Sequence, residues 1–247
     1  MIKIKKALIS VSDKSNILEL AQHLKTFNIE ILSTGGTAKL LKENKIQVTD
    51  VSDYTKFPEM LDGRVKTLHP KIHGGILGRR DIPEHQETMK NHKIDPIDLV
   101  IVNLYPFEAT IKQENCTLDL AIENIDIGGP AMIRSAAKNY KHVAVLTNSN
   151  DYKKFSDEII KNEGSVSEDF SFSLAKKAFA RTSAYDAAIN NYLTSDDQNK
   201  FPEKLSKTLN KVMDLRYGEN PHQQAAFYKD SIESTGTLSS FDQIQGD

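Results

Sequence analysis

Short apolar runs of strand length alternate with helical patterns along most of this chain. Four such runs are Ala7–Val11, Ile29–Leu32, Asp98–Leu104 and His142–Leu146. After the first run, Ile17, Ala21 and Leu24 recur at helical spacing. The nearly continuous apolar run ending at Leu104 is typical of a strand buried on both faces. The alternation predicts an α/β protein, with a central, mainly parallel sheet in a three-layer fold flanked by helices.

The same patterns place the remaining elements. Ile46–Val51 is a further predicted strand, and residues 52–96 are expected to form loops and short helices. Helices are predicted over 38–43, 118–125, 130–138, 152–159 and 172–193. Residues 195–200 have the composition of a linker, and the residues from there to Asp247 are short of core side chains. A helical segment and an incomplete second domain are therefore expected to follow the α/β domain.

Composition narrows the possible partners and the compartment. The 32 Lys and Arg residues nearly balance the 34 Asp and Glu residues, so the net charge of -2 favours neither a nucleic-acid nor a membrane partner. The longest apolar runs fall far short of the ~20 residues needed to cross a bilayer. The single cysteine, Cys116, excludes an internal disulfide and fits a reducing compartment. We expect a cytoplasmic protein.

Five polar or glycine-containing segments follow predicted strands or interrupt the loop-rich region. They are Ser12–Lys14, Thr34–Thr37, Arg64–Thr67, Asn103–Tyr105 and Asp126–Gly128. Parallel sheets bind ligands beyond the carboxyl ends of their strands. We therefore expect these segments to form one site.

The residue types in these segments suit a phosphorylated ligand. Free N–H groups at the helix start after Thr34-Gly35-Gly36-Thr37 favour an anion, although a tight turn with a helix cap explains the same residues. Lys14 occupies the matching position after the first predicted strand, where its charge could face the same anion. The alternative is that Lys14 is an ordinary surface lysine exposed to solvent. The positive charges of Arg64 and Lys66 must be either paired with an anion or exposed to solvent. An exposed basic loop is the competing interpretation of that pair.

Three further features have simpler explanations that stay open. Asp126 precedes Gly-Gly-Pro130, where it either faces a ligand or caps the helix and pairs with Arg134. Tyr105, after a buried strand, fits the core as well as a site. His69 and His73 are four residues apart but lack a third ligand at zinc spacing, so no metal is expected.

Six motifs together resemble a known family. The motifs are Ser10–Lys14, Ser33–Ala38, Phe57–Met60, Gly63–Pro70, Asn103–Phe107 and Ile125–Gly129. Over residues 7–193 they are similar in order and spacing to the cyclohydrolase half of the bifunctional purine biosynthesis family PurH. Leu215–Gln223 resembles the opening of that family's transformylase half.

The resemblance implies a fold, a reaction and a set of residues. It implies a methylglyoxal-synthase-like domain over 1-198 that closes FAICAR, a formylated imidazole carboxamide ribotide, to IMP. Lys138 would be the proton donor/acceptor, with Lys66, Tyr105 and Asp126 around the reacting groups. The nucleotide would lie against Ser12, Asp13, Lys14, Thr34, Gly35, Gly36, Thr37, Arg64, Val65, Lys66, Thr67, Val102, Asn103, Asp126, Ile127 and Gly128.

The resemblance also implies a truncated start of the transformylase domain over 199-247. Arg216, Tyr217 and His222 resemble residues that contact the AICAR substrate, whereas the family's catalytic Lys–His pair would follow Asp247. No formyl transfer from 10-formyltetrahydrofolate, the co-substrate of that half, is therefore expected of this chain. The cyclohydrolase itself would need neither metal nor organic cofactor, and the family is homodimeric. The alternatives are a methylglyoxal-synthase-like lyase and a non-catalytic nucleotide-effector module.

Overall fold

The structure is a computed structural model that describes residues 1–195, 203–230, 236, 238–240 and 244–245. It contains two compact units, Met1–Ser183 and Ala184–Asp247. The domain boundary expected between residues 198 and 199 lies outside the described residues, so it stays a prediction.

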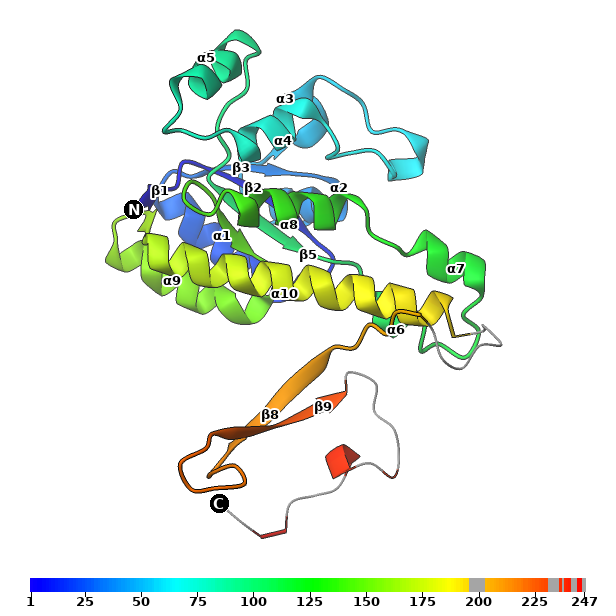
Figure 1. The fold of residues 1–247 in the computed structure, drawn as a ribbon. Helices are drawn as coiled ribbons and strands as arrows, with labels where there is room; N and C mark the ends of the chain where they lie inside the picture. Colours follow the sequence, from blue (N-terminus) through cyan, green and yellow to red (C-terminus); the bar gives the residue numbers. More distant parts are fainter. Residues whose placement is uncertain (196–202, 231–235, 237, 241–243, 246–247) are drawn as a thin grey trace. The chain divides into compact units, whose positions relative to one another are not determined.

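A five-stranded parallel sheet forms the centre of the first unit (Figure 1). Its strand order is β4-β3-β2-β5-β6. The strands are β2 (Lys6–Val11), β3 (Glu30–Ser33), β4 (Thr49–Asp50), β5 (Leu99–Asn103) and β6 (Ala144–Leu146). The central strand β2 aligns Ala7 with both Ile31 and Leu99. This arrangement confirms the predicted α/β class with a parallel sheet.

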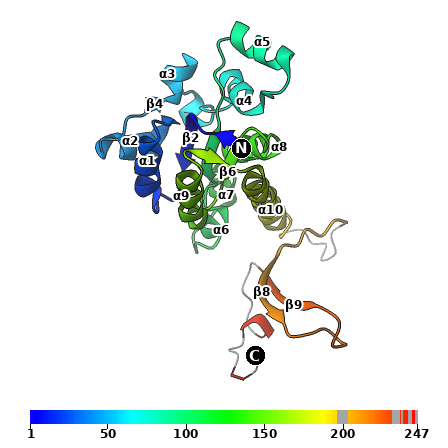
Figure 2. The same ribbon diagram turned by 90° about the vertical axis from the view of Figure 1, so that its left-hand side faces the viewer.

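Helices cover both faces of the sheet (Figure 2). On one face lie α1 (Ile17–Thr26) and α9 (Tyr152–Lys161), which contact each other. On the other lies α8 (Gly128–Lys138), which packs on β5, β6 and α4 (Pro70–Leu77). Alternate residues of β2 point to opposite faces: Ile9 packs in the core beneath α1 and α9, whereas Leu8, also fully buried, belongs to the other layer.

The remaining elements of the first unit lie around this core. They are β1 (Ile2–Lys3), α2 (Gly35–Glu43), α3 (Val51–Thr55), η1 (Leu61–Gly63), α5 (Pro83–Asn91), α6 (Phe107–Thr110), α7 (Leu118–Glu123), η2 (Ser149–Asp151), β7 (Ser165–Val166) and the part of α10 (Glu168–Leu193) that ends at Ser183. The second unit contains β8 (Leu209–Leu215), β9 (Ala225–Asp230) and η3 (Leu238–Ser240).

The structure corrects three expectations about single elements. The strand predicted over Ile46–Val51 is reduced to Thr49–Asp50, because Val51 already begins α3. Helix α10 begins at Glu168, one turn earlier than predicted. Two antiparallel pairings, β1 with β7 and β8 with β9, were not predicted.

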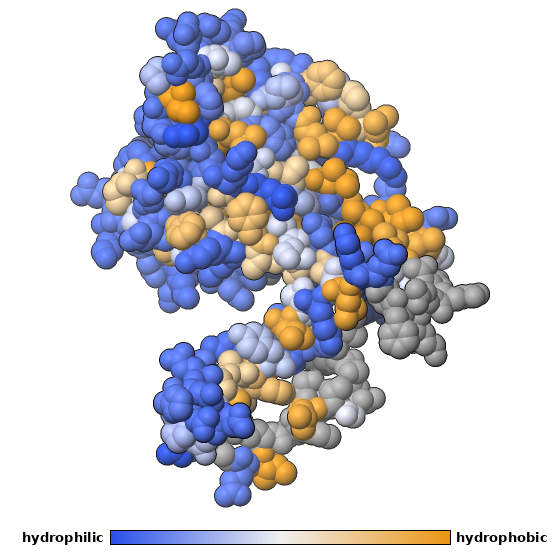
Figure 3. All heavy atoms as spheres, viewed as in Figure 1, coloured by the Kyte–Doolittle hydropathy of each residue, from blue (hydrophilic) through white to orange (hydrophobic). Residues whose placement is uncertain are grey.

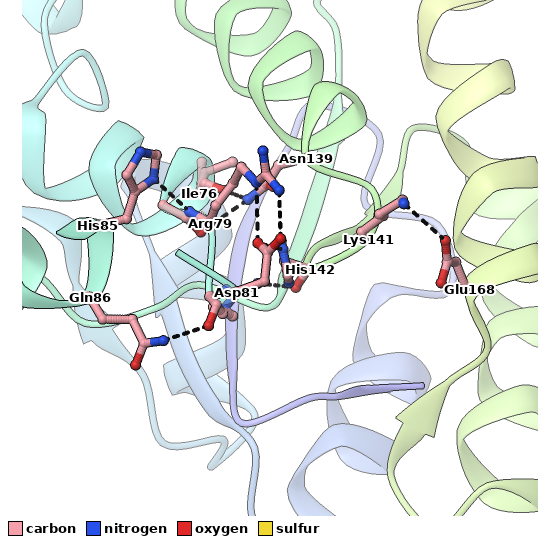
Figure 4. A network of polar contacts seen from close by, with 11 residues as sticks. Ile76, Arg79, Asp81, His85, Gln86, Asn139, Lys141, His142 and Glu168 are labelled. Carbon is pink, nitrogen blue, oxygen red and sulfur yellow. Dashed lines mark hydrogen bonds and ion pairs between the residues drawn. The ribbon is translucent and has the colours of Figure 1, made fainter. Parts of the chain in front are cut away.

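A polar cluster closes the amino edge of the sheet. Buried Asp98 accepts hydrogen bonds from the backbone N–H groups of Lys5 (2.8 Å) and Lys6 (3.0 Å) and pairs with Arg80 at 3.1 Å. Burial raises the pKa of Asp98, although the two N–H groups and Arg80 oppose that shift. In Figure 4, neighbouring Asp81 lies between Arg79 and His142. These contacts fix the edge of the sheet opposite the polar segments that sequence analysis grouped into one site.

No helix in the described part of the chain is long and apolar enough to cross a membrane.

Candidate functional site

A cavity of about 630 Å³ lies at the carboxyl edge of the sheet. All five segments grouped by sequence analysis contribute to its wall. Its size lies in the range of pockets that bind small molecules. The lining residues are Ser10, Val11, Ser12, Lys14, Thr34, Gly35, Gly36, Thr37, Asp62, Gly63, Arg64, Lys66, Thr67, Val102, Asn103, Tyr105, Ile122, Glu123, Ile125, Asp126, Ile127, Gly128, Gly129 and Met132.

One end of the cavity has the features of an anion site. Helix α2 begins at Gly35, which has a φ of 55°, in the left-handed region that glycine adopts readily. A Cβ atom built on Gly35 would lie 3.8 Å from Lys66 Nζ, and one built on Gly36 would lie 3.9 Å from Lys14 Nζ. Two ammonium groups therefore approach the first N–H groups of one helix. Such a helix terminus favours negative charge.

Two side chains hold the strand ends that carry these groups. Asn103 Oδ1 accepts hydrogen bonds from the backbone N–H of Ser12 (2.7 Å) and of Asp13 (3.0 Å), while its Nδ2 donates to the Asp13 carbonyl. The Thr37 hydroxyl donates to the Val11 carbonyl at 3.0 Å and accepts from the Val11 N–H at 3.1 Å. Asn103 and Thr37 thus shape the cavity floor through the backbone.

Another part of the cavity wall carries a partly buried carboxyl group, that of Asp126. Asp126 Oδ1 accepts a hydrogen bond from the backbone N–H of Gly129 at 2.8 Å, in the first turn of α8. Burial raises the pKa of Asp126, although backbone hydrogen bonds from Gly129 and Tyr105 oppose the shift. Tyr105 is half exposed in the same wall. A carboxyl group with a raised pKa, in a cavity that a phenol also lines, is suited to proton transfer.

Two carboxylates that sequence analysis did not assign to the site pair with its cations. Glu59 Oε1 lies 3.0 Å from Lys66 Nζ. Glu123, in the last turn of α7, pairs with Arg64. The motif Phe57-Pro-Glu59-Met60 was the sequence signal for the first pair, whereas nothing in the sequence marked Glu123.

The flanks of the cavity are apolar. Figure 3 shows hydrophobic side chains gathered over the segment between α3 and α4 and over α7. Exposed side chains on these elements include Met60, Leu61, Leu68, Leu118 and Ile122. Ile122 also lines the cavity, whose polar groups therefore lie beside an apolar rim.

Three of the expected site residues do not line the cavity. Asp13 uses its carboxylate to bind the backbone N–H (2.9 Å) and hydroxyl (2.6 Å) of Ser15. Val65 pairs through its backbone with Met60. Lys138 is the last residue of α8, ten residues after Gly128 and therefore roughly 15 Å along the helix. It lines a different hollow, with Leu77, Arg134, Ser135, Ala137, Tyr140, Phe172, Ala175, Lys176 and Phe179.

The residues expected to contact a second substrate lie in the second unit. Arg216, Tyr217 and His222 are exposed in the turn between β8 and β9. Hydrogen bonds from Gly218 N to the Gln223 carbonyl (2.8 Å) and from Asn220 N to Gln223 Oε1 (2.9 Å) order this turn. Within the described ranges, no group of three or more His, Cys, Asp or Glu side chains is placed to hold a metal ion. His69 caps α4 instead, accepting from Lys71 N at 3.1 Å.

Comparison with known proteins identifies the family. Residues 16–131 match the model of the MGS-like domain, and residues 136–247 match that of the AICARFT/IMPCHase bienzyme. The bifunctional purine biosynthesis protein PurH of Neisseria meningitidis serogroup A is 57% identical over 255 residues, which cover 100% of this chain and 48% of that protein. The chain belongs to the PurH family. PurH of Neisseria gonorrhoeae is also 57% identical, over 98% of this chain and 48% of its own length.

The chain spans about half the length of these PurH relatives. A crystal structure of ForH matches the fold with a TM-score of 0.68 and 35% identity, covering 77% of this chain and 99% of that one. The MGS-like match begins at residue 16, after the cavity-lining residues 10–14, and covers the other segments of the wall up to the start of α8. The cavity of this PurH-family chain therefore belongs to the MGS-like fold predicted from the sequence.

Proposed function

We propose that this chain is an IMP cyclohydrolase that closes FAICAR to IMP. The observation that carries the proposal is one cavity with an anion site at the start of α2 and a partly buried carboxyl group of raised pKa, Asp126, in its wall. The phosphate of a ribotide would bind at the anion site, and its reacting base would lie near Asp126. Membership of the PurH family supports the same assignment.

The reaction forms a bond between the carboxamide nitrogen and the formyl carbon. One proton leaves each of the two nitrogens, and the formyl oxygen departs as water. An amide is a poor nucleophile, so holding its nitrogen against the formyl carbon supplies much of the acceleration. In this proposal the phosphate binds at Gly35 and Gly36 with Lys14, which anchors the base near Asp126.

The proton transfers are assigned to groups in the cavity wall. Asp126 accepts the carboxamide proton, because its raised pKa makes it a stronger base than an exposed carboxylate. Tyr105 and Lys66 donate to the formyl oxygen, on which negative charge develops. Lys138 keeps the role of proton donor/acceptor that the resemblance implies, although it lies at the far end of α8 from Gly128.

The test is absorbance-monitored conversion of FAICAR to IMP by the purified chain. Asp126→Asn keeps the shape of the side chain and removes the base, so we expect kcat to fall by about 10²–10⁴-fold. The matched control is Lys39→Met, because Lys39 is exposed on α2 and does not line the cavity. No turnover by the wild type, with IMP still bound, would instead identify a nucleotide-effector module.

A separate variant tests the lysine of α8. We expect Lys138→Ala to lower turnover, with Lys39→Met again as the control. Unchanged turnover would confine the proton transfers to the cavity wall and remove Lys138 from the mechanism.

The longer relatives support further proposals about the whole protein. In these, 10-formyltetrahydrofolate serves as the co-substrate of the transformylase half, and two copies of the chain assemble as a homodimer.

A further inference from the structure

The segment between α3 and α4 forms a small hairpin that carries Lys66 into the cavity. Met60 and Val65 form an antiparallel bridge, with backbone hydrogen bonds of 3.2 and 3.3 Å in the two directions. Between them, Leu61, Asp62 and Gly63 have φ values of 54°, 52° and 89°, so the chain reverses through three left-handed residues. Cross-strand neighbours in such a pair lie on the same side.

The next cross-strand pair outward is Glu59 with Lys66, and their side chains meet. Glu59 Oε1 lies 3.0 Å from Lys66 Nζ; the Lys66 side chain is partly buried, with 29% exposed, whereas that of Glu59 is 44% exposed. They meet directly over Gly63. A Cβ atom there would lie 2.6 Å from Lys66 Cε and 2.7 Å from Glu59 Oε1, so the ion pair needs a glycine at this position.

This contact fixes a flexible side chain at the anion site. Lysine has four rotatable side-chain bonds, and holding it in one geometry costs entropy. Its ammonium group lies between Glu59 and the start of α2, where a Cβ built on Gly35 would be 3.8 Å away. Glu59 does not itself line the cavity. In this geometry Glu59 therefore acts on a bound ligand through Lys66 and not by direct contact.

We infer that Glu59 is a positioning residue, which holds Lys66 at the edge of the cavity in the orientation needed for ring closure. The inference rests on the proposed cyclohydrolase function. Without Glu59, Lys66 retains its charge but samples other rotamers, so the reacting geometry is populated less often. At the same time the removal of a nearby negative charge favours an anionic substrate. Loss of the Glu59 carboxylate should therefore lower turnover and strengthen substrate binding.

The experiment measures kcat and KM for FAICAR in Glu59→Gln, Lys66→Met and the double variant. We expect Glu59→Gln to lower kcat about tenfold without raising KM, since small misplacements of a catalytic group cost large factors in rate. In the Lys66→Met background, Glu59→Gln should have no further effect on kcat. The control is Glu43→Gln, which removes a carboxylate paired with Lys39 on the exposed side of α2.

Two results would overturn the inference. One is a kcat of Glu59→Gln within twofold of the wild type, and the other is an equal loss of kcat in the presence and absence of Lys66. Full turnover by the wild type and by Glu43→Gln shows that the proposed function holds whichever result is found. If the wild type does not turn over, calorimetric titration with IMP replaces kinetics. If the effects of Glu59→Gln and Lys66→Met on the free energy of IMP binding are coupled, the inference is supported. If the two effects are additive, it is overturned.

Discussion

Replacement of Thr37 by valine isolates one hydroxyl group that holds the cavity floor. The last pair between β2 and β3 is Ile9 with Ser33. Two residues further along β2, the N–H and the carbonyl of Val11 have lost that neighbouring strand, and the Thr37 hydroxyl binds both of them. Thr37 is 3% exposed, so water does not readily replace it. Thr37→Val keeps the shape and leaves two buried backbone groups without a partner.

The expected loss follows from that count of groups. Each buried polar group left unpaired costs about 1–3 kcal/mol, so the loss of both partners in Thr37→Val is expected to lower the free energy of unfolding by about 2–6 kcal/mol. The matched control is Thr110→Val, at 8% exposure. The Thr110 hydroxyl donates only to the Pro106 carbonyl, which also accepts from the backbone N–H groups of Ala109 and Thr110. Its loss should cost less than about 1 kcal/mol.

The assay is urea unfolding followed by far-UV circular dichroism, because the chain contains no tryptophan for fluorescence. A lower midpoint with an unchanged slope would indicate a change in stability alone. If Thr37→Val and Thr110→Val lose the same amount, or Thr37→Val loses less than about 1 kcal/mol, the argument from unpaired backbone groups is refuted.

Two other substitutions test single contacts. A Cβ on Gly129 would lie 2.4 Å from Asp126 Oδ2 and 2.8 Å from the buried Leu104 Cδ2, so we expect Gly129→Ala to lower both kcat, at least tenfold, and the urea midpoint; unchanged kcat would contradict the role of Asp126. Burial lowers the pKa of His73, so the folded protein keeps it neutral while the unfolded chain gains a proton below ~6.5. Stability present above that pH is lost as the pH falls, and between pH 7.5 and 5.5 His73→Asn should lose less stability than the wild type. Equal losses on urea unfolding would refute this.

The basis for the histidine prediction is its hydrogen bonding. The Ser135 hydroxyl donates to the Ala131 carbonyl at 2.8 Å, so it can only accept from His73 Nδ1, 3.2 Å away. The Nδ1 atom therefore carries the proton. Among the described residues, the buried Nε2 atom has no hydrogen-bond partner. Protonation there would bury an uncompensated charge.

The parallel sheet and the cavity wall were predictable from local patterns. Strands such as Leu99–Asn103 are buried on both faces, so their apolar runs are continuous, and the polar residues that follow them necessarily meet at one edge. The short pairing of β1 with β7 was not predictable, because two-residue strands have no period. The strand expected at Ile46 was misplaced for a related reason: Ile46 is buried as a strand residue would be, but it is not paired.

The unpredicted parts of the site depend on geometry that sequence spacing does not encode. The pairing of Glu59 with Lys66 depends on three consecutive left-handed residues, two of which are not glycine. The distance of Lys138 from the cavity follows from the length of α8, whose first turn lies at the site and whose last residue does not. Asn103 lines the cavity as expected of a ligand contact, but no sequence pattern indicated that its amide group binds the backbone of Ser12 and Asp13.

The strand order has a consequence for synthesis on the ribosome. Strand β2 is complete at Val11, yet its partner β5 begins at Leu99, and Ala7 aligns with that residue. While the intervening chain emerges, β2 can pair only with β3, and its other edge stays open to chaperones or to other nascent chains. The cavity wall closes only after Asp126 and Gly129 have followed. A nascent chain stalled before residue 99 would therefore have three of the five strands and the residues of the anion site, without the part of the wall that carries Asp126.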